Sequence, residues 1–158
     1  IILGEATWNT GSTALFKNAY HEFPWYTQGG TGFVDARDVA AAMIQLMDHA
    51  VSAERFLLSH AHLSFREVLT RIAVEFGKTP PQRYARPWMS EIVWRIESLK
   101  SLFSNTEPLL TKETAAAAHA TTLYSSNKLL SVLPGFSFTP VDATIARTCK
   151  WLSRYYNL

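Results

Sequence analysis

The stretch Gly-Gly-Thr-Gly-Phe-Val-Asp-Ala-Arg-Asp-Val-Ala, residues 29–40, decides how this sequence is interpreted, because it is compatible with two different sites. Its three glycines precede a helix-like segment, as they do in loops that bind phosphate through backbone amides and a helix N-terminus. Asp35 opposes that interpretation, since a carboxylate at this place would repel phosphates. Pro24 also makes the preceding segment a poor buried strand, because proline cannot donate a ladder hydrogen bond.

A structural junction between a strand and a helix explains the same stretch with ordinary chemistry. Asp35 fits the N-cap of a helix, and Asp38 follows in its first turn, where the helix dipole favours carboxylates. We therefore expect a short strand over Gly32–Val34 that runs into a helix. Apolar residues then recur at helical spacing: Val39, Ala42, Met43, Leu46, Met47 and Ala50.

Composition indicates a globular chain. It has 158 residues, 47% hydrophobic and 18% charged, enough for one domain with a core. The net charge of +2 and the scattered Lys and Arg argue against nucleic acid or an anionic membrane as partners, and no apolar stretch approaches the roughly 20 residues that span a bilayer. The single Cys149 excludes an internal disulfide and suits a reducing compartment, which predicts a cytoplasmic protein. The start at Ile-Ile-Leu-Gly resembles an interior strand, so we expect a fragment.

Further strand and helix signals come before residue 82. Ile1–Leu3 predicts a strand, and Ser12 predicts the cap of a helix with Leu15, Phe16, Ala19 and Phe23 on one face. Residues 55–59 are short and apolar, which is consistent with a buried strand. Ser64 and Glu67 form a capping box, with Leu63 placed to pack on Val68. Gly77 then ends that helix before two prolines.

The second half of the sequence is predicted to be helical. A helix begins near Pro87 with a stripe of Trp88, Ile92, Ile96, Leu99 and Phe103, and Thr111 caps a short helix through the alanines. A last helix starts at Thr139 and Pro140, and its inner face carries Val141, Ile145, Cys149, Leu152 and Tyr156. With a few short β-strands among mostly α-helical segments, the chain lacks a complete sheet of its own.

Three segments, taken in order, resemble a known family. Ile-Ile-Leu-Gly at 1–4, Gly-Phe-Val-Asp-Ala-Arg-Asp-Val-Ala at 32–40, and the run from Ser-Ser-Asn-Lys-Leu-Leu to Thr139-Pro140 look like landmarks of the extended short-chain dehydrogenase/reductases, the NAD-dependent epimerase/dehydratase and dihydroflavonol-reductase-like enzymes. The resemblance implies an α/β, Rossmann-type parent fold. Residues 1–158 would be its single C-terminal substrate-binding portion, and the absent N-terminal half would hold NAD or NADP and the catalytic Ser, Tyr and Lys. The chain alone should then be inert.

The same resemblance suggests which residues line the substrate. It places the loop Gly4–Ser12 beside the nicotinamide, so Leu3 and Gly4 would adjoin the cofactor. The expected substrate-binding residues are Trp8, Asn9, Ser12, Phe16, Thr31 and Phe33. The alternative is an exposed loop with one packed tryptophan.

The substrate class is suggested by a departure from the family pattern. Thr31 stands where sugar-nucleotide epimerases have an arginine that clamps the diphosphate, and Ala115–Ala118 replace further basic residues. Because arginine is the natural bidentate partner of phosphate, its absence favours a small carbonyl compound over a nucleotide sugar.

Other motifs are better explained by structure than by catalysis. Tyr124 and Lys128 have the Tyr-x-x-x-Lys spacing but lie at a helix start within the family's late landmark. His60 and His62 lack further partners for a metal, and Cys149 fits a buried thiol. A different class of function remains open, a self-sufficient helical binding module without cofactor. A half-enzyme should expose apolar surface on Ile1–Leu3 and on the Val39 helix, and association of further copies also stays open.

Overall fold

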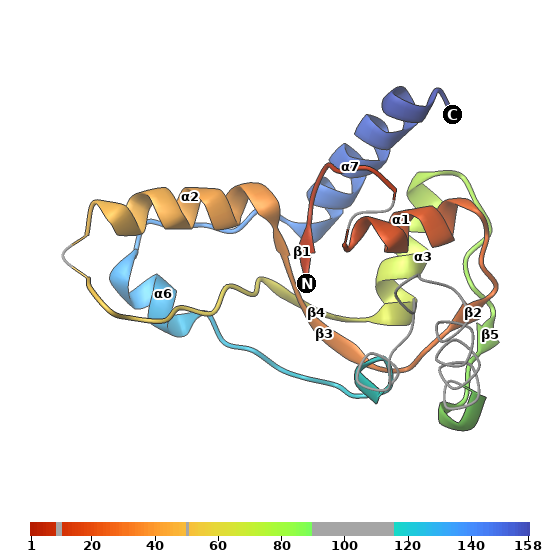
Figure 1. Ribbon diagram of the computed structural model, residues 1–158, viewed down its shortest axis with the longest axis horizontal. Helices are drawn as coiled ribbons and strands as arrows, with labels where there is room; N and C mark the ends of the chain where they lie inside the picture. The colour runs from red at the N-terminus through yellow and green to blue at the C-terminus, as the bar shows by residue number, and fades with distance from the viewer. Residues whose placement is uncertain (9–10, 50, 90–115) are drawn as a thin grey trace, which may run out of the picture.

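A small three-stranded sheet forms the centre of the computed structural model, which describes residues 1–8, 11–49, 51–89 and 116–158. Strand β1 (Ile2–Leu3) runs parallel to β3 (Gly30–Asp35), and β3 runs antiparallel to β4 (Ala61–Ser64), in the order β1-β3-β4. A second pair, β2 (Trp25–Tyr26) and β5 (Arg83–Tyr84), is parallel and lies at the end of the molecule opposite helix α6 (Figure 1).

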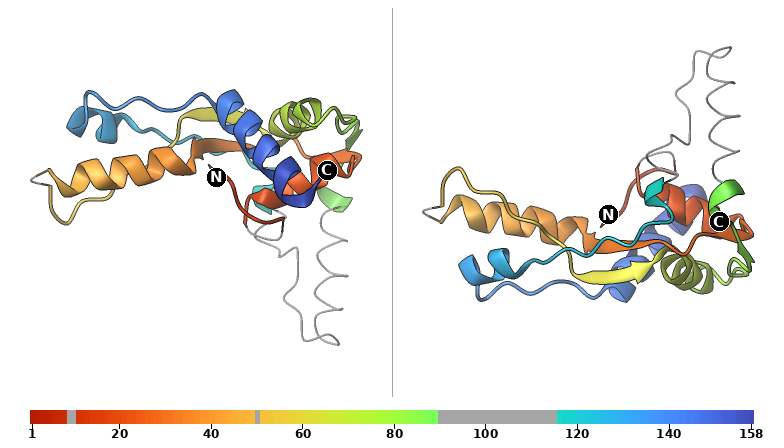
Figure 2. Two further views of the ribbon diagram at one scale, coloured as in Figure 1. Left: turned by 90° about the horizontal axis from the view of Figure 1, so that it is seen from above. Right: turned by 90° about the horizontal axis from the view of Figure 1, so that it is seen from below.

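Helices pack around the sheet and extend beyond it. Helices α1 (Thr13–Tyr20), α3 (Phe65–Glu75) and α7 (Val141–Tyr156) gather at one end. Helix α2 (Ala36–Met47) and the short α6 (Asn127–Val132) form an arm at the other end (Figure 1). Views from above and below show α2 leaving the end of β3 with α6 beside it (Figure 2). The described part is thus a small α/β unit with more helix than strand.

The junction predicted at Asp35 is confirmed. Strand β3 passes directly into α2, and Asp35 keeps an extended backbone while its Oδ1 accepts a hydrogen bond from the Arg37 N–H at 2.8 Å. This is the N-cap arrangement that satisfies an otherwise unpaired amide at the start of a helix.

The glycines before Asp35 serve close backbone crossings. Strand β3 begins at Gly30, two residues before the predicted start at Gly32, so Gly30 and Gly32 both lie within the strand. A Cβ on Gly29 would lie 2.3 Å from the Ala118 carbonyl oxygen, and one on Gly32 would lie 2.0 Å from Ser59 Oγ. Side chains are excluded because neighbouring segments press against the strand. This crowding leaves no space there for a phosphate.

Two apolar clusters hold the fold. The main cluster joins β1, β3, α1, α3 and α7 through Leu3, Phe16, Phe33, Val68, Ile72, Ile145 and Leu152, each at most 2% exposed. The smaller one fills the arm with Ala42, Leu129 and Leu133. The capping box of Ser64 and Glu67 is confirmed. The last helix is confirmed too, but it begins one residue later than predicted, at Val141 with Pro140 as its N-cap residue.

Some predicted elements were wrong. Residues 55–59 are not a strand; Ser59 is buried, but its N–H and carbonyl bond the hydroxyl of Ser126, so a side chain takes the place of a ladder. Phe23 lies beyond α1 and is half exposed, because the helix ends at Tyr20 and Glu22 adopts a left-handed φ of 54°.

Other predictions fall partly or wholly outside the described residues. The helix near Pro87 is described only over its first turn, so the stripe from Ile92 to Phe103 is not covered. The Thr111 cap, Asn9 and Ala50 also lie outside the described ranges.

Candidate functional site at the outer edge of strand β1

One side of β1 is paired and the other is open. The Val34 N–H donates to the Ile1 carbonyl at 3.0 Å, so the polar groups of Ile1 and Leu3 face β3. Because polar groups alternate along a strand, those of Ile2 face the opposite way. In the described ranges β1 ends the sheet on that side, which we call the outer edge of β1. Ile1 and Ile2 are 41% and 51% exposed there.

A cleft of about 450 Å³ lies at this edge. It sits where β1 ends and where α1 and α2 begin, which is the end of parallel strands at which α/β proteins usually bind ligands. Its volume falls within the range of small-molecule sites. We call it the β1 cleft, and it is lined by Ile1, Ile2, Gly4, Glu5, Ala6, Gly11, Ser12, Thr13 and Ala36.

Two of the predicted site residues meet in this cleft. Gly4 follows β1 directly, and a Cβ there would come within 2.8 Å of the Ala36 side chain. Ser12 lies across the cleft at the start of α1, and its hydroxyl donates to the Ile2 carbonyl. Leu3, the other predicted neighbour of the cofactor, is fully buried in the main core cluster.

The predicted aromatic residues lie in the core instead. Phe16 and Phe33 are 0% exposed. Trp8 stacks on Tyr156 with ring centroids 5.0 Å apart, and the backbone N–H of Trp8 donates to the Tyr156 hydroxyl at 2.9 Å. Thr31 pairs with Leu63 in the β3–β4 ladder. In this structure none of these four lines the β1 cleft.

An ion-pair network borders the cleft, and no sequence pattern predicted it. Glu5 Oε1 accepts from Arg37 at 2.6 Å and from Arg147 Nε at 2.9 Å. Arg147 also binds the Asp35 carboxylate, which accepts from the Thr144 hydroxyl at 2.6 Å. Residues more than a hundred positions apart therefore fix the loop after β1 to α7.

The network shifts the acidity of its carboxyl groups. Burial raises the pKa of Asp35, but hydrogen bonds from Thr144 and Arg147 outweigh it, so the pKa lies below its ordinary value. Burial likewise acts upward on the pKa of Glu5, and its backbone hydrogen bond and Arg147 bring it below the ordinary value. Both groups are therefore held as carboxylates.

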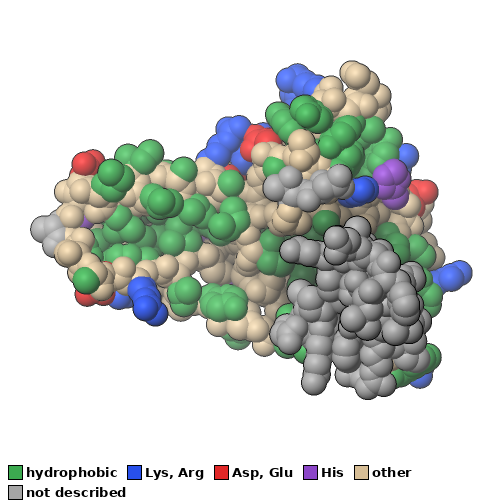
Figure 3. Space-filling view, in the orientation of Figure 1, with side chains coloured by type: hydrophobic (Ala, Val, Ile, Leu, Met, Phe, Trp, Pro, Cys, Tyr) green, Lys and Arg blue, Asp and Glu red, His purple; other side chains and the backbone are tan. Residues whose placement is uncertain are grey.

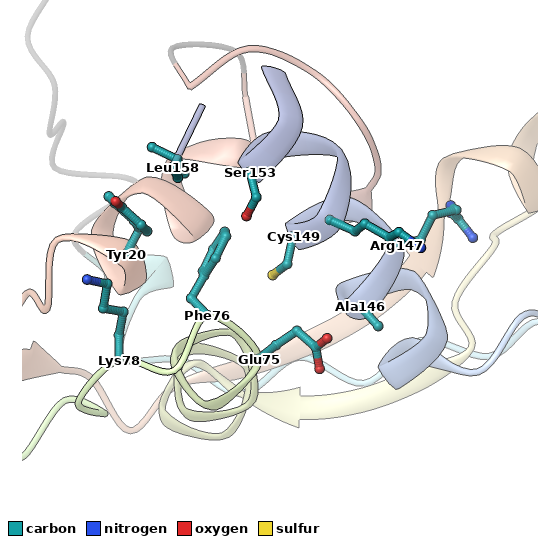
Figure 4. Close-up of a pocket in the computed structure, with 10 residues that line it drawn as sticks. Tyr20, Glu75, Phe76, Lys78, Ala146, Arg147, Cys149, Ser153 and Leu158 are labelled. Carbon is teal, nitrogen blue, oxygen red and sulfur yellow. The ribbon is translucent and has the colours of Figure 1, made fainter. Parts of the chain in front are cut away.

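A larger cavity of about 700 Å³ lies between α1, α3 and α7 (Figure 4). The Lys78 ammonium there lies 4.8 Å from the Tyr20 ring centroid, and the Arg147 guanidinium points away from the cavity. Burial and the Glu75 charge raise the pKa of the Cys149 thiol to about 12, so the thiol is protonated at neutral pH, as expected for a buried structural cysteine. The cavity gathers none of the residues that the sequence proposed.

The Tyr-x-x-x-Lys motif does not form a catalytic pair on one helix. Tyr124 precedes α6, and its N–H donates to His62 Nε2 at 2.8 Å. Lys128 binds the Glu54 carboxylate and the Arg55 carbonyl. No group of three or more metal-binding side chains occurs in the ranges described, and no helix in them could cross a membrane.

A cluster of arginines and aromatic rings was missed. Arg66 lies over the Tyr26 ring at 4.7 Å and Arg83 over Trp25 at 5.7 Å, while Tyr26 and Tyr84 approach within 6.0 Å. In the sequence this cluster appears only as two short segments, Trp25-Tyr26 and Arg83-Tyr84. Nothing in the sequence connects the two segments, and the cluster becomes recognisable only when β2 and β5 pair.

Comparison with known proteins identifies the fold. No protein-family model matches the sequence. No curated protein matches it. A nucleoside-diphosphate-sugar epimerase structure from Pseudomonas aeruginosa matches with a TM-score of 0.72 and 20% identity, over 98% of this chain and 46% of that one.

Two further structures agree. The enzyme WbmH from Bordetella bronchiseptica, in complex with NAD+, has a TM-score of 0.64 and 14% identity, over 99% of this chain and 44% of its own. A GDP-L-fucose synthetase from Naegleria fowleri bound to NADP has a TM-score of 0.67 and 16% identity, over 99% of this chain and 45% of its own. The chain thus shares its fold with part of these enzymes and spans less than half of their length.

Proposed function

We propose that this chain is the C-terminal, substrate-binding portion of an NAD(P)-dependent epimerase, dehydratase or carbonyl reductase. The observation that carries the proposal is the β1 cleft, which opens at the outer edge of β1. A Rossmann half with a strand beside β1 would close the cleft and bring its cofactor to Gly4 and Ser12. The fold shared with NAD+- and NADP-bound enzymes supports this arrangement.

An exposed apolar stripe on α2 supports the same proposal. Ala40, Met43, Ile44 and Met47 recur at the spacing of one helical face and point away from the arm's own core, with Met47 84% exposed. Apolar surface runs along the arm in the space-filling view (Figure 3). The stripe and the exposed Ile1 and Ile2 are apolar surface of the kind that protein partners cover.

A binding measurement tests whether the other half of the enzyme, and not this chain, holds the nucleotide cofactor. The glycine-rich cofactor loop and the catalytic Ser, Tyr and Lys would belong to the other half, so this chain alone should bind neither NAD(H) nor NADP(H). Isothermal titration calorimetry with each nucleotide checks this, and micromolar binding by the lone chain would contradict it. Serum albumin in the same buffer serves as the non-specific reference.

For the substrate we propose a small carbonyl compound. The proposal rests on the family resemblance, which expects a diphosphate-clamping arginine where this chain has the uncharged Thr31. In the structure Thr31 lies in the β3–β4 ladder and does not line the β1 cleft. Nucleotide sugars are the second candidate, because the neighbouring structures are sugar-nucleotide enzymes by name and because Arg66 and Arg83 stand among aromatic rings. Arginines and aromatic faces are suited to bind phosphates and bases.

Titration separates the two substrate classes. An enzyme in which this chain is joined to its cofactor-binding half would be titrated with UDP-hexoses and, with NADPH, with small ketones. We expect turnover of ketones and no tight UDP-hexose binding. Tight UDP-hexose binding that an Arg83→Gln variant weakens at least tenfold would establish the second candidate instead, with Arg154→Gln, on the last turn of α7, as the control for lost charge.

A further inference from the structure

The turn that ends α3 fixes a lysine at the larger cavity, the one of about 700 Å³ between α1, α3 and α7, which we call the helical cavity. Apart from Leu158, every residue that lines it belongs to these helices or to the turn after α3, so packed helices shape it. In that turn Gly77 adopts a left-handed φ of 65°, and its N–H donates to the Val74 carbonyl at 3.0 Å. The Lys78 N–H donates to the Ala73 carbonyl at 2.8 Å. These two bonds form a Schellman motif, which holds the backbone of Lys78 in one place.

The Lys78 side chain lies against a ring and has no carboxylate bound to it. Its ammonium is 4.8 Å from the Tyr20 ring centroid, which is a cation–π contact. In the described ranges neither Lys78 nor Lys150, the second lysine that lines the cavity, takes part in an ion pair. The Thr79 N–H and, more weakly, the Lys78 charge lower the pKa of Glu22, but this carboxylate bonds Thr79 and not the ammonium. The Lys78 ammonium is therefore available to an anionic ligand.

The wall beside Lys78 is apolar. Phe76 ends α3 and packs edge-on against Tyr20, with ring centroids 5.4 Å apart. The Ser153 hydroxyl points toward Phe76 from α7, and Lys78 and Glu75 lie on opposite sides of Phe76 (Figure 4). A ligand in the cavity would thus meet a positive charge on one side of an aromatic ring and a negative charge on the other.

We propose that the helical cavity binds a small monocarboxylate with an apolar body. The carboxylate pairs with the Lys78 ammonium, Lys150 adds a second positive charge, and the apolar body lies on Phe76. Glu75 repels a second negative charge, which disfavours dicarboxylates and phosphates. The volume of about 700 Å³ is in the range of small-molecule sites. The helical cavity shares no lining residue with the β1 cleft, so this is a second site, beyond the proposed function.

Three ligands with the same ring and a two-carbon side chain test the charge preference. Phenylacetate carries a carboxylate, 2-phenylethanol a hydroxyl and 2-phenylethylamine an ammonium. Each is titrated into the 15N-labelled chain, and the amide shifts of Gly77, Lys78 and Ser153 are followed by NMR. We expect phenylacetate to bind at least about fivefold more tightly than the other two, because only it forms a charge-assisted contact with Lys78. Phenylsuccinate, which has a second carboxylate, should bind more weakly than phenylacetate.

A pair of substitutions assigns the preference to one side chain. Lys78→Met removes the ammonium and keeps an apolar stem, so the dissociation constant of phenylacetate should rise at least about fivefold. That of 2-phenylethanol should stay at the wild-type value, which shows that the cavity itself is intact. Arg154→Met loses the same charge from the last turn of α7, outside the cavity, and should leave both constants unchanged.

Several results would overturn the proposal. These are equal affinity for phenylacetate and 2-phenylethanol, no binding of phenylacetate, and an unchanged phenylacetate constant in Lys78→Met. The ligand series uses the wild-type chain, so it decides the question even if Lys78→Met does not fold. Neither nucleotide nor ketone enters the test, so its failure is distinct from failure of the proposed function.

Discussion

At the scale of single residues, Asp35 combines two tasks. Its Oδ1 caps α2 through the Arg37 N–H, and its Oδ2 holds Thr144 and Arg147 of α7. The side chain of Asp35 is 0% exposed, whereas that of Arg147 is 26% exposed. Removing the charge of Asp35 would thus leave a half-buried guanidinium with only Glu5, a change that typically costs a few kcal/mol.

Asp35→Asn should therefore lower stability and change its pH dependence. The folded pKa of Asp35 is depressed, so its carboxylate stabilises the fold above the unfolded pKa, and this stability is lost as pH falls through the lower folded pKa. Urea unfolding across the acidic range should show a loss of about 1–3 kcal/mol for Asp35→Asn at neutral pH. That difference should shrink on acidification.

The exposed pair of Glu54 and Lys128 offers the control. Its side chains are 48% and 52% exposed, so Glu54→Gln should cost less than about 1 kcal/mol and leave the pH profile parallel to wild type. An Asp35→Asn profile that also runs parallel to wild type would show that the network contributes nothing specific to acid stability.

At the scale of helices and strands, sequence patterns correctly predicted those features that depend on residues close together in the chain. The Asp35 junction, the Ser64 capping box and the buried face of α7 follow from caps and helical spacing, and all three are confirmed. The prediction of a strand over residues 55–59 was wrong. The apolar residues of this segment match the pattern of a buried strand, but the Ser59 backbone bonds the hydroxyl of the distant Ser126 instead of a neighbouring strand.

The candidate site was predictable only in outline. The resemblance gave the loop after β1, and Gly4 and Ser12 do line the β1 cleft. It did not give the direction of each side chain, and Trp8, Phe16 and Phe33 turn into the core. Glu5 and Asp35 share two partners, Arg37 on α2 and Arg147 on α7. The sequence alone does not show that α7, more than a hundred residues away, lies beside them.

At the scale of the whole molecule, the exposed stripe on α2 distinguishes a half-enzyme from a self-sufficient module. Met43 and Met47 are 62% and 84% exposed. If a partner normally covers them, the lone chain should bind a hydrophobic dye such as ANS and self-associate. Met43→Glu with Met47→Lys keeps the net charge and adds a favourable pair one turn apart. This double variant should reduce dye fluorescence and association at unchanged stability.

Val74 on α3 provides the matched comparison. Val74 is 65% exposed, and α3 lies away from the arm (Figure 1). Val74→Gln likewise keeps the net charge and removes an exposed apolar side chain, and it should leave dye binding and association near wild type, measured by ANS fluorescence and sedimentation velocity. A wild-type chain that stays monomeric at high concentration and binds no dye would contradict the half-enzyme. The β1 cleft and the stripe would then belong to a module that works by itself.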